Sequence, residues 1–162
     1  YEPEFLNQFR HIMGRKIGLQ EYQPDDEPLI NQLLELMQAN NVDYTIFFRS
    51  LCDFSKNNQT VRDQFLDREG FDSWAEKYLQ RLAKQSSTDA QRQEKMLASN
   101  PKYILRNYMA QAAIEQAYQG DYTEVQLLLK VLQSPFDKHP QAEKYAGLPP
   151  DWAEQIAVSC SS

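Results

Sequence analysis

Apolar residues recur every three or four positions along most of the chain, which is the period of amphipathic helices. In the clearest segment, the spacing of the apolar residues fits 3.6 residues per turn and does not fit a strand. These residues are Phe71, Trp74, Tyr78, Leu79 and Leu82. Similar stripes predict helices over residues 5–17, 28–39, 43–51, 61–69, 71–82, 101–119 and 121–134, with a shorter helix around residue 96. We therefore predict an all-α fold, an irregular bundle of about seven helices.

Polar residues and glycines mark several of the predicted helix boundaries. Asn100 before Pro101 predicts a helix start, because Asn caps an N-terminus and Pro fits the first turn. Asp121, followed three residues later by Glu124, resembles a capping box at the start of the last long helix. Gly70 is expected to end the short helix over residues 61–69, because glycine readily adopts the left-handed conformation of a C-cap.

Prolines set the end of the chain apart from the helices. Pro135 should end the last long helix, and Pro140, Pro149 and Pro150 leave room for no more than one turn near residues 151–155. We therefore divide the chain into a helical domain, residues 1–133, and a Pro-containing extension, residues 134–162, which ends in a cysteine-bearing tail.

Composition refines this picture by excluding partners. The chain has 162 residues and a mass of 19.0 kDa, and it carries a formal charge of −6 with a pI near 4.9. An acidic chain lacks the excess of Lys and Arg that nucleic-acid phosphates require, so no nucleic-acid partner is expected. No apolar run approaches the roughly 20 residues of a membrane span, so no membrane partner is expected.

Cysteine usage and the first residues bear on the origin of the chain. Two cysteines are too few for a secreted disulfide scaffold, which indicates a reducing compartment. The opening run Tyr1-Glu-Pro-Glu lacks the basic and apolar regions of a signal peptide. We expect this run to continue from a longer chain.

Motifs for catalysis, nucleotide binding or metal binding are sparse. A phosphate-binding loop needs glycines five positions apart, whereas Gly14 and Gly18 are four apart. His11 and His139 are separated by 128 positions, and no paired Cys and His spacing accompanies them. We therefore predict no catalytic, cofactor-binding or metal-ligating residue in this chain.

Asp53-Phe54-Ser55 looks like a variant of the magnesium-binding triplet of protein kinases. The catalytic-loop motif that should precede such a triplet is missing. We therefore expect Asp53 to face solvent and Phe54 to pack in the core.

Other charged and aromatic residues are expected to be structural. The acids at residues 25–27 should complement the positive end of the helix dipole that begins beside them. Tyr44, Phe47 and Phe48 are expected to be core aromatics. We expect solvated or tertiary ion pairs at Arg49, Arg81 and Arg106.

The two cysteines have different expected environments. Cys160 lies two residues from the end of the sequence, where a thiol is usually exposed and chemically available. The sequence leaves open whether that thiol is functional or incidental. Cys52 lies among apolar residues of an aromatic helix and is expected to be a small buried hydrophobe.

Several segments carry a family resemblance that covers essentially the whole chain. They comprise residues 100–115, which begin N-P-K-Y-I-L-R-N-Y, with residues 120–121, 135–137, 149–153 and the ending S-C-S-S over 159–162. Residues 14–19 and 43–49 match the preceding part of the same family. The chain resembles the C-terminal end of the selenoprotein O family.

The resemblance implies a parent enzyme with a protein-kinase-like fold that transfers AMP from ATP to protein hydroxyls, using Mg²⁺ or Mn²⁺. The family's nucleotide and metal residues lie upstream of Tyr1, so none is assigned to this chain. The implied partners are that kinase-like domain and the protein substrates of the parent. The alternatives are a helical protein interaction module whose cysteine is incidental and, with less support, an autonomous enzyme built around Asp53.

The resemblance also assigns a role to Cys160. The corresponding residue is selenocysteine in many eukaryotic members and cysteine in bacterial members, which implies a bacterial, cytoplasmic parent and a redox-regulatory thiol. Its disulfide partner is either Cys52 or a cysteine of the kinase-like part, and the sequence leaves both open.

Overall fold

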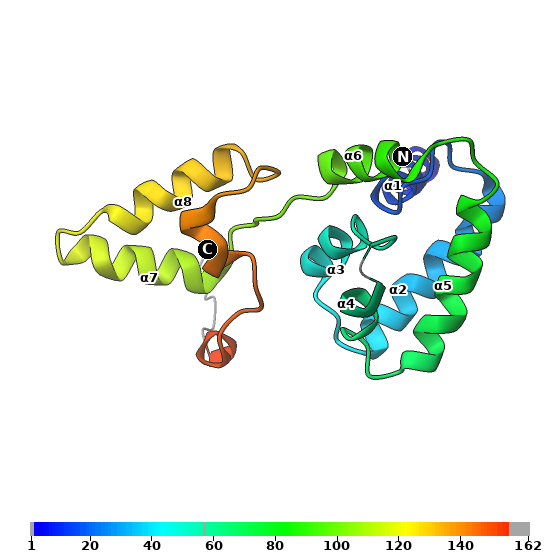
Figure 1. Cartoon of the computed structure of the whole chain (residues 1–162). Helices are drawn as coiled ribbons and strands as arrows, with labels where there is room; N and C mark the ends of the chain where they lie inside the picture. The colour runs from blue at the N-terminus through cyan, green and yellow to red at the C-terminus, as the bar shows by residue number, and fades with distance from the viewer. Residues whose placement is uncertain (1, 57, 156–162) are drawn as a thin grey trace. The chain divides into compact units, whose positions relative to one another are not determined.

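The computed structural model describes residues 2–56 and 58–155, and this part of the chain is helical without strands (Figure 1). Its α-helices are α1 (Glu2–Lys16), α2 (Glu27–Ala39), α3 (Tyr44–Leu51), α4 (Asn58–Arg62), α5 (Arg68–Leu82), α6 (Asp89–Ser99), α7 (Asn107–Tyr118) and α8 (Thr123–Gln133). Short 3₁₀ helices are η1 (Pro24–Asp26), η2 (Pro140–Tyr145) and η3 (Asp151–Gln155). Seven of the described α-helices have eight or more residues, which confirms the all-α prediction.

The chain forms two compact units, Tyr1–Asn100 and Pro101–Ser162. The sequence analysis placed its boundary at residues 133 and 134 instead. The difference has a physical reason, because α7 and α8 share one apolar core with η2 of the Pro-containing segment. The extension therefore belongs to the folded second unit.

The first unit is built around α5. Trp74 and Tyr78 stack on one face of α5, with ring centroids 4.9 Å apart. Their polar atoms are satisfied in the core, because Trp74 Nε1 donates to the carbonyl of Leu29 at 3.0 Å and Tyr78 Oη donates to the carbonyl of Ile17 at 2.7 Å. Burial raises the pKa of the Tyr78 hydroxyl, so it stays a donor. The aromatic residues that the sequence placed on one face of this helix thus form the centre of the hydrophobic core of the first unit.

The second unit is a helical hairpin, in which α7 packs against α8 (Figure 1). Gly120 turns the chain between the two helices with φ of +86°. The segment before α7 is held by the far end of the hairpin, because the amides of Lys102 and Tyr103 both donate to the carbonyl of Pro135. Trp152 of η3 contacts the Tyr108 ring edge to face at a centroid distance of 5.7 Å.

The predicted helix start at Asn100 and Pro101 is wrong. Asn100 is the C-cap of α6, and α7 begins only at Asn107. The Asn100 side chain is fully buried in contacts with α1, so it is not available to cap a following helix. Pro101 instead starts a non-helical segment that leads to the buried Tyr103.

Two further capping predictions are wrong, because the groups that were expected to form the caps bind other partners. Gly70 lies in the first turn of α5, and its amide donates to the side chain of Asp67, which is the N-cap. Asp121 accepts from the amide of Thr123, but Glu124 does not complete a capping box. The Glu124 carboxylate binds Lys144 and Tyr145 of η2 instead.

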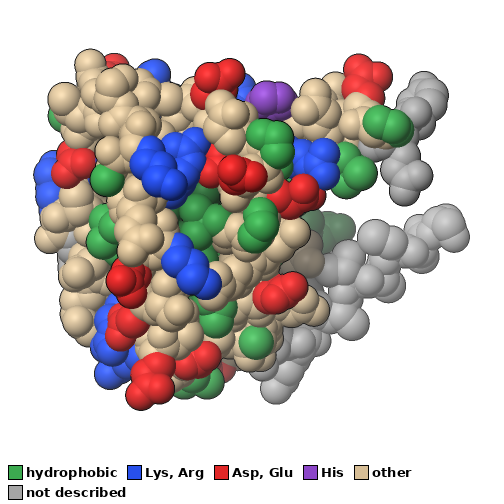
Figure 2. Space-filling model, turned by 90° about the vertical axis from the view of Figure 1, so that its right-hand side faces the viewer, with side chains coloured by type: hydrophobic (Ala, Val, Ile, Leu, Met, Phe, Trp, Pro, Cys, Tyr) green, Lys and Arg blue, Asp and Glu red, His purple; other side chains and the backbone are tan. Residues whose placement is uncertain are grey.

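One face of the molecule carries charges of both signs (Figure 2). Figure 2 shows Lys and Arg side chains close to Asp and Glu side chains on one face, with apolar side chains in small groups between them. Within the described residues, no helix combines the length and the apolar character that crossing a membrane requires.

We predict opposite effects for two glycine substitutions near the end of α1. Gly18 has φ of +79°, and a Cβ there would lie 2.6 Å from Cγ of Arg92. Gly18→Ala should therefore lower the free energy of unfolding by about 2–4 kcal/mol, from left-handed strain and steric overlap. Gly14→Ala, in the helix and with its nearest contact at 3.4 Å, should raise it by up to about 1 kcal/mol. Urea denaturation of both variants, followed by circular dichroism, checks the prediction, and equal effects would contradict it.

Candidate functional site

The cysteine singled out by the sequence, Cys160, lies outside the described residues. Cys52 is described and is buried beside the C-terminus of α3. Its Sγ donates to the carbonyl of Phe48 at 3.3 Å and lies 3.6 Å from Nδ2 of Asn100. Burial raises the pKa of the Cys52 thiol, because the thiolate is poorly solvated there. Cys52 is thus a protected structural thiol in this fold.

Asn100, which sequence reasoning treated only as a helix cap, is the polar centre of the first unit. Its Nδ2 donates to the carbonyl of Lys16 at 2.9 Å, and its Oδ1 accepts from Lys16 Nζ at 3.2 Å. Its backbone carbonyl accepts from Nη1 of Arg49 at 2.9 Å. These bonds connect the ends of α1 and α6 with α3. The sequence showed only an Asn before a proline, and its burial and tertiary partners could not be deduced from spacing.

Lys16 is held over the aromatic residues of α3. Its Nζ lies 5.2 Å from the ring centroid of Tyr44 and 5.1 Å from that of Phe48, both within cation–π range. Burial lowers the pKa of the Lys16 ammonium group. Phe47 and Phe48 are buried as predicted, whereas Tyr44 is partly exposed at the edge of this cluster.

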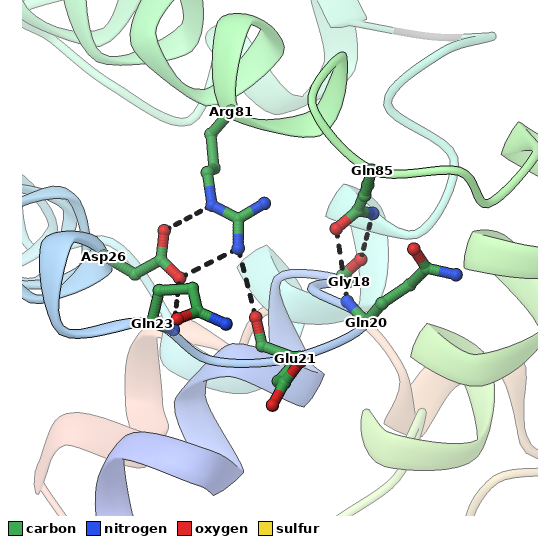
Figure 3. A network of polar contacts seen from close by, with 7 residues as sticks. All are labelled: Gly18, Gln20, Glu21, Gln23, Asp26, Arg81 and Gln85. Atoms are coloured by element: carbon green, nitrogen blue, oxygen red, sulfur yellow. Dashed lines mark hydrogen bonds and ion pairs between the residues drawn. The ribbon is translucent and has the colours of Figure 1, made fainter.

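A groove of about 740 Å³ crosses the first unit between the segment after α1 and the C-terminal half of α5. Figure 3 shows the polar network at its wall, where Arg81 points toward Asp26. Arg81 forms a two-point ion pair with Asp26, at 2.5 Å from Nε and 3.0 Å from Nη2. Nη2 of Arg81 also donates to the carbonyl of Glu21, and the amide of Gln23 donates to Asp26.

This network gives Asp26 a different role from the one expected of the acids at residues 25–27. Its carboxylate is only 2% exposed and is occupied by Arg81 and Gln23, so it is a buried tertiary partner and not a solvated helix cap. The tertiary ion pair expected for Arg81 is confirmed. Arg49 differs, because it binds the backbone carbonyls of Leu97 and Asn100.

A second set of hydrogen bonds lies in the same wall of the groove, near Gly18 (Figure 3). Nε2 of Gln85 donates to the carbonyl of Gly18 at 2.9 Å, and Oε1 of Gln85 accepts from the amide of Gln20 at 3.2 Å. In this part of the groove wall, the polar groups of the network bond to one another.

Asp53 and Phe54 lie as the sequence predicted. Asp53 is exposed and accepts from the amide group of Gln93, while Phe54 packs against Phe71 and Tyr78. Among the described residues, no group of three or more His, Cys, Asp or Glu side chains could hold a metal ion.

His139 has a structural role in the second unit. Its Nε2 lies 2.9 Å from the carbonyl of Ser134 and 3.1 Å from the Ser134 hydroxyl. A carbonyl oxygen can only accept, so Nε2 carries the hydrogen and cannot take a proton from the serine. The pair therefore does not form a nucleophile with its base. The backbone amide of His139 donates to Oη of Tyr103, which fixes the segment before η2.

We predict that the ion pair at the groove wall is a main support of the first unit. Asp26→Asn should lower the free energy of unfolding by about 3 kcal/mol, because it leaves the Arg81 charge without its buried partner. Asp25→Asn is the matched control, since Asp25 is exposed in the same turn, and it should change stability by less than about 0.5 kcal/mol. Urea denaturation followed by tryptophan fluorescence measures both. Similar losses in the two variants would show that the pair adds nothing.

Comparisons with known proteins identify the family of this helical chain. The family described as "Protein adenylyltransferase SelO" matches residues 1–133. A relative from Herminiimonas arsenicoxydans, described as protein nucleotidyltransferase YdiU, is 48% identical over 166 residues, which cover 100% of this chain and 33% of that protein. Relatives of the same description are 47% identical in Pseudomonas fluorescens Pf0-1 and 43% identical in Vibrio vulnificus CMCP6, and the alignments cover 100% of this chain and 34% of each protein. The chain spans about a third of the length of these curated relatives. It therefore belongs to the SelO family of protein adenylyltransferases.

Proposed function

We propose that this chain is the helical C-terminal region of a bacterial, cytoplasmic protein adenylyltransferase and that it supports a kinase-like catalytic part elsewhere in the same protein. That part would transfer AMP from ATP to protein Ser, Thr or Tyr hydroxyls with Mg²⁺ or Mn²⁺. Two observations support the proposal. The curated relatives are named nucleotidyltransferases and are about three times as long as the match. The chain also belongs to the SelO family of protein adenylyltransferases.

The surface that carries this proposal is the apolar stripe of α1 between residues 5 and 12. Four apolar side chains at helical spacing are between 37% and 68% exposed there: Phe5, Leu6, Phe9 and Ile12. Met13 in the same helix and Ile17 just after its end are fully buried in the core of the first unit. The apolar side of α1 is therefore exposed from residue 5 to residue 12 and covered from residue 13 onward.

An open stripe of this kind is costly in water, because each large apolar side chain gains roughly 1.5–3 kcal/mol when it is fully buried. Contiguous exposed apolar surface commonly marks an interface. We assign the kinase-like part of the same protein as the occupant, since about two thirds of each relative's length lies outside the match. The first unit would then bind that part through α1.

The alternative is a helical interaction module that uses the same stripe to recruit a separate protein. In that case the stripe would contribute to the choice of protein substrate and not to the integrity of the catalytic part. The two functions differ in what a charge placed on α1 would disrupt.

We predict that Phe5→Glu combined with Phe9→Glu, in the full-length parent protein, reduces AMP transfer by about tenfold or more, because two carboxylates would be desolvated at the interface. Labelling of the enzyme itself and of a protein substrate with an ATP analogue measures the effect, and the thermal midpoint should fall in parallel. Asn7→Glu combined with Gln8→Glu is the control, since it adds the same charge at exposed polar positions of α1.

Self-labelling and thermal midpoint equal to wild type in the Phe5/Phe9 variant would overturn the supporting role. Loss of substrate labelling alone, with self-labelling intact, would favour the interaction module. The 162-residue chain by itself should transfer no AMP in the same assay.

We also propose that Cys160 is a redox-regulatory thiol of the parent, following the family resemblance of the chain's last residues. The environment of Cys52 supports a partner outside this chain. A bridge from Cys52 would require its buried thiol to leave the contacts with Phe48 and Asn100 at the centre of the first unit.

We predict that oxidised glutathione changes AMP transfer by the full-length protein and that dithiothreitol restores it. Cys160→Ser should abolish this response, whereas Cys52→Ala should keep it, because Cys52 is enclosed and its thiolate is disfavoured. An unchanged response in Cys160→Ser would contradict the redox role. Loss of the response in Cys52→Ala would identify Cys52 as the partner.

A further inference from the structure

A second, smaller hollow of about 340 Å³ lies in the first unit between the end of α1 and one face of α6. Its lining includes the basic residues Arg15, Arg92 and Lys95, together with Gly18 and Ser99. Arg92, Lys95 and Ser99 follow one another at intervals of three and four residues, so they share one face of α6. Arg15 reaches the hollow from the last turn of α1. We call this hollow the α1–α6 pocket.

The charge of the α1–α6 pocket is opposite to that of the chain. The chain has a formal charge of −6, yet three basic side chains and no carboxylate line this pocket. Like charges gathered at one place repel each other, and an anion between them would relieve that repulsion. Helix dipole compensation accounts for Arg15 at the C-terminus of α1, but not for Arg92 and Lys95, which lie before the last turn of α6.

Arg92 is fixed in place and is not a mobile surface cation. Only 10% of its side chain is exposed, and its Nη1 forms an ion pair with Asp89 at 2.8 Å. Its aliphatic stem packs on Gly18, where a Cβ would come within 2.6 Å. A guanidinium has five N–H donors, so the pair with Asp89 leaves others for a ligand. A preoriented arginine of this kind suits an oxyanion, which can accept two parallel N–H bonds.

We propose that the α1–α6 pocket binds a small oxyanion, a phosphate or carboxylate group, through Arg15, Arg92 and Lys95. Ser99 and the apolar residues Leu19 and Ala98 line the same space. The proposal does not depend on AMP transfer, since all of its groups lie within the first unit of this chain. It adds a ligand site to a region that has no catalytic assignment.

The test is a titration of the ¹⁵N-labelled 162-residue chain with inorganic phosphate and, separately, with acetate, at constant ionic strength set by sodium chloride. Saturable shifts of the amide signals of Gly18, Arg92 and Lys95 are expected with one or both anions. Saturation with phosphate alone identifies a phosphate site, and saturation with acetate alone identifies a carboxylate site. Shifts that never saturate, or that chloride reproduces, would overturn the proposal.

Variants make the test specific to the pocket. Arg15→Gln combined with Lys95→Gln should weaken the affinity about tenfold or more, through loss of two charge-assisted contacts, and leaves the packed Arg92 intact. Lys77→Gln combined with Lys84→Gln is the matched control, because it removes the same charge from exposed residues at the larger groove. Equal affinities in the two double variants would also overturn the proposal, since binding would then follow net charge alone.

Discussion

The buried side chain of Asn100 is the interaction on which the first unit depends. It is fully enclosed, and one amide group bonds both the carbonyl and the ammonium group of Lys16, while the Asn100 carbonyl holds Arg49. An unpaired amide at that position would cost more than any single bond returns, so the three helix ends must meet in one arrangement. The same residue ends α6, and Pro101 follows it without an amide hydrogen to continue a helix. The border between the two units therefore lies between Asn100, which hydrogen bonds fix in the first unit, and Pro101, which cannot continue the helix.

Periodicity predicted the helices well because burial repeats with the helical turn. The stripe around Trp74 and Tyr78 forms the core, and Asp43 caps α3 through a bond from the amide of Ile46. Capping signals failed where a side chain had a better distant partner. Asn100 turned toward α1, and Glu124 turned toward η2. Such choices depend on which residues meet in space, and a single sequence does not contain that information in its local spacing.

Candidate sites were harder to predict than helices for the same reason. The sequence correctly indicated that Cys52 would be buried and that Asp53 would be exposed, because both follow from local pattern. It did not indicate that Asp26 and Arg81, 55 positions apart, form one wall of a groove. Nor could spacing show that Arg15 approaches Arg92 and Lys95. Within the first unit, charged residues act mainly in groups assembled from separate helices, and only the fold brings them together.

The placement of the two tryptophans has a practical consequence. Trp74 is fully buried, stacked on Tyr78 and hydrogen-bonded to a backbone carbonyl, whereas Trp152 lies in the second unit and is about half exposed. The chain has two tryptophans, so each compact unit contains a single indole of its own. A dry indole emits at shorter wavelength than a wet one. The intrinsic fluorescence of the chain therefore reports on both units. Loss of the shorter-wavelength emission, which comes from Trp74, follows unfolding of the first unit without any added label.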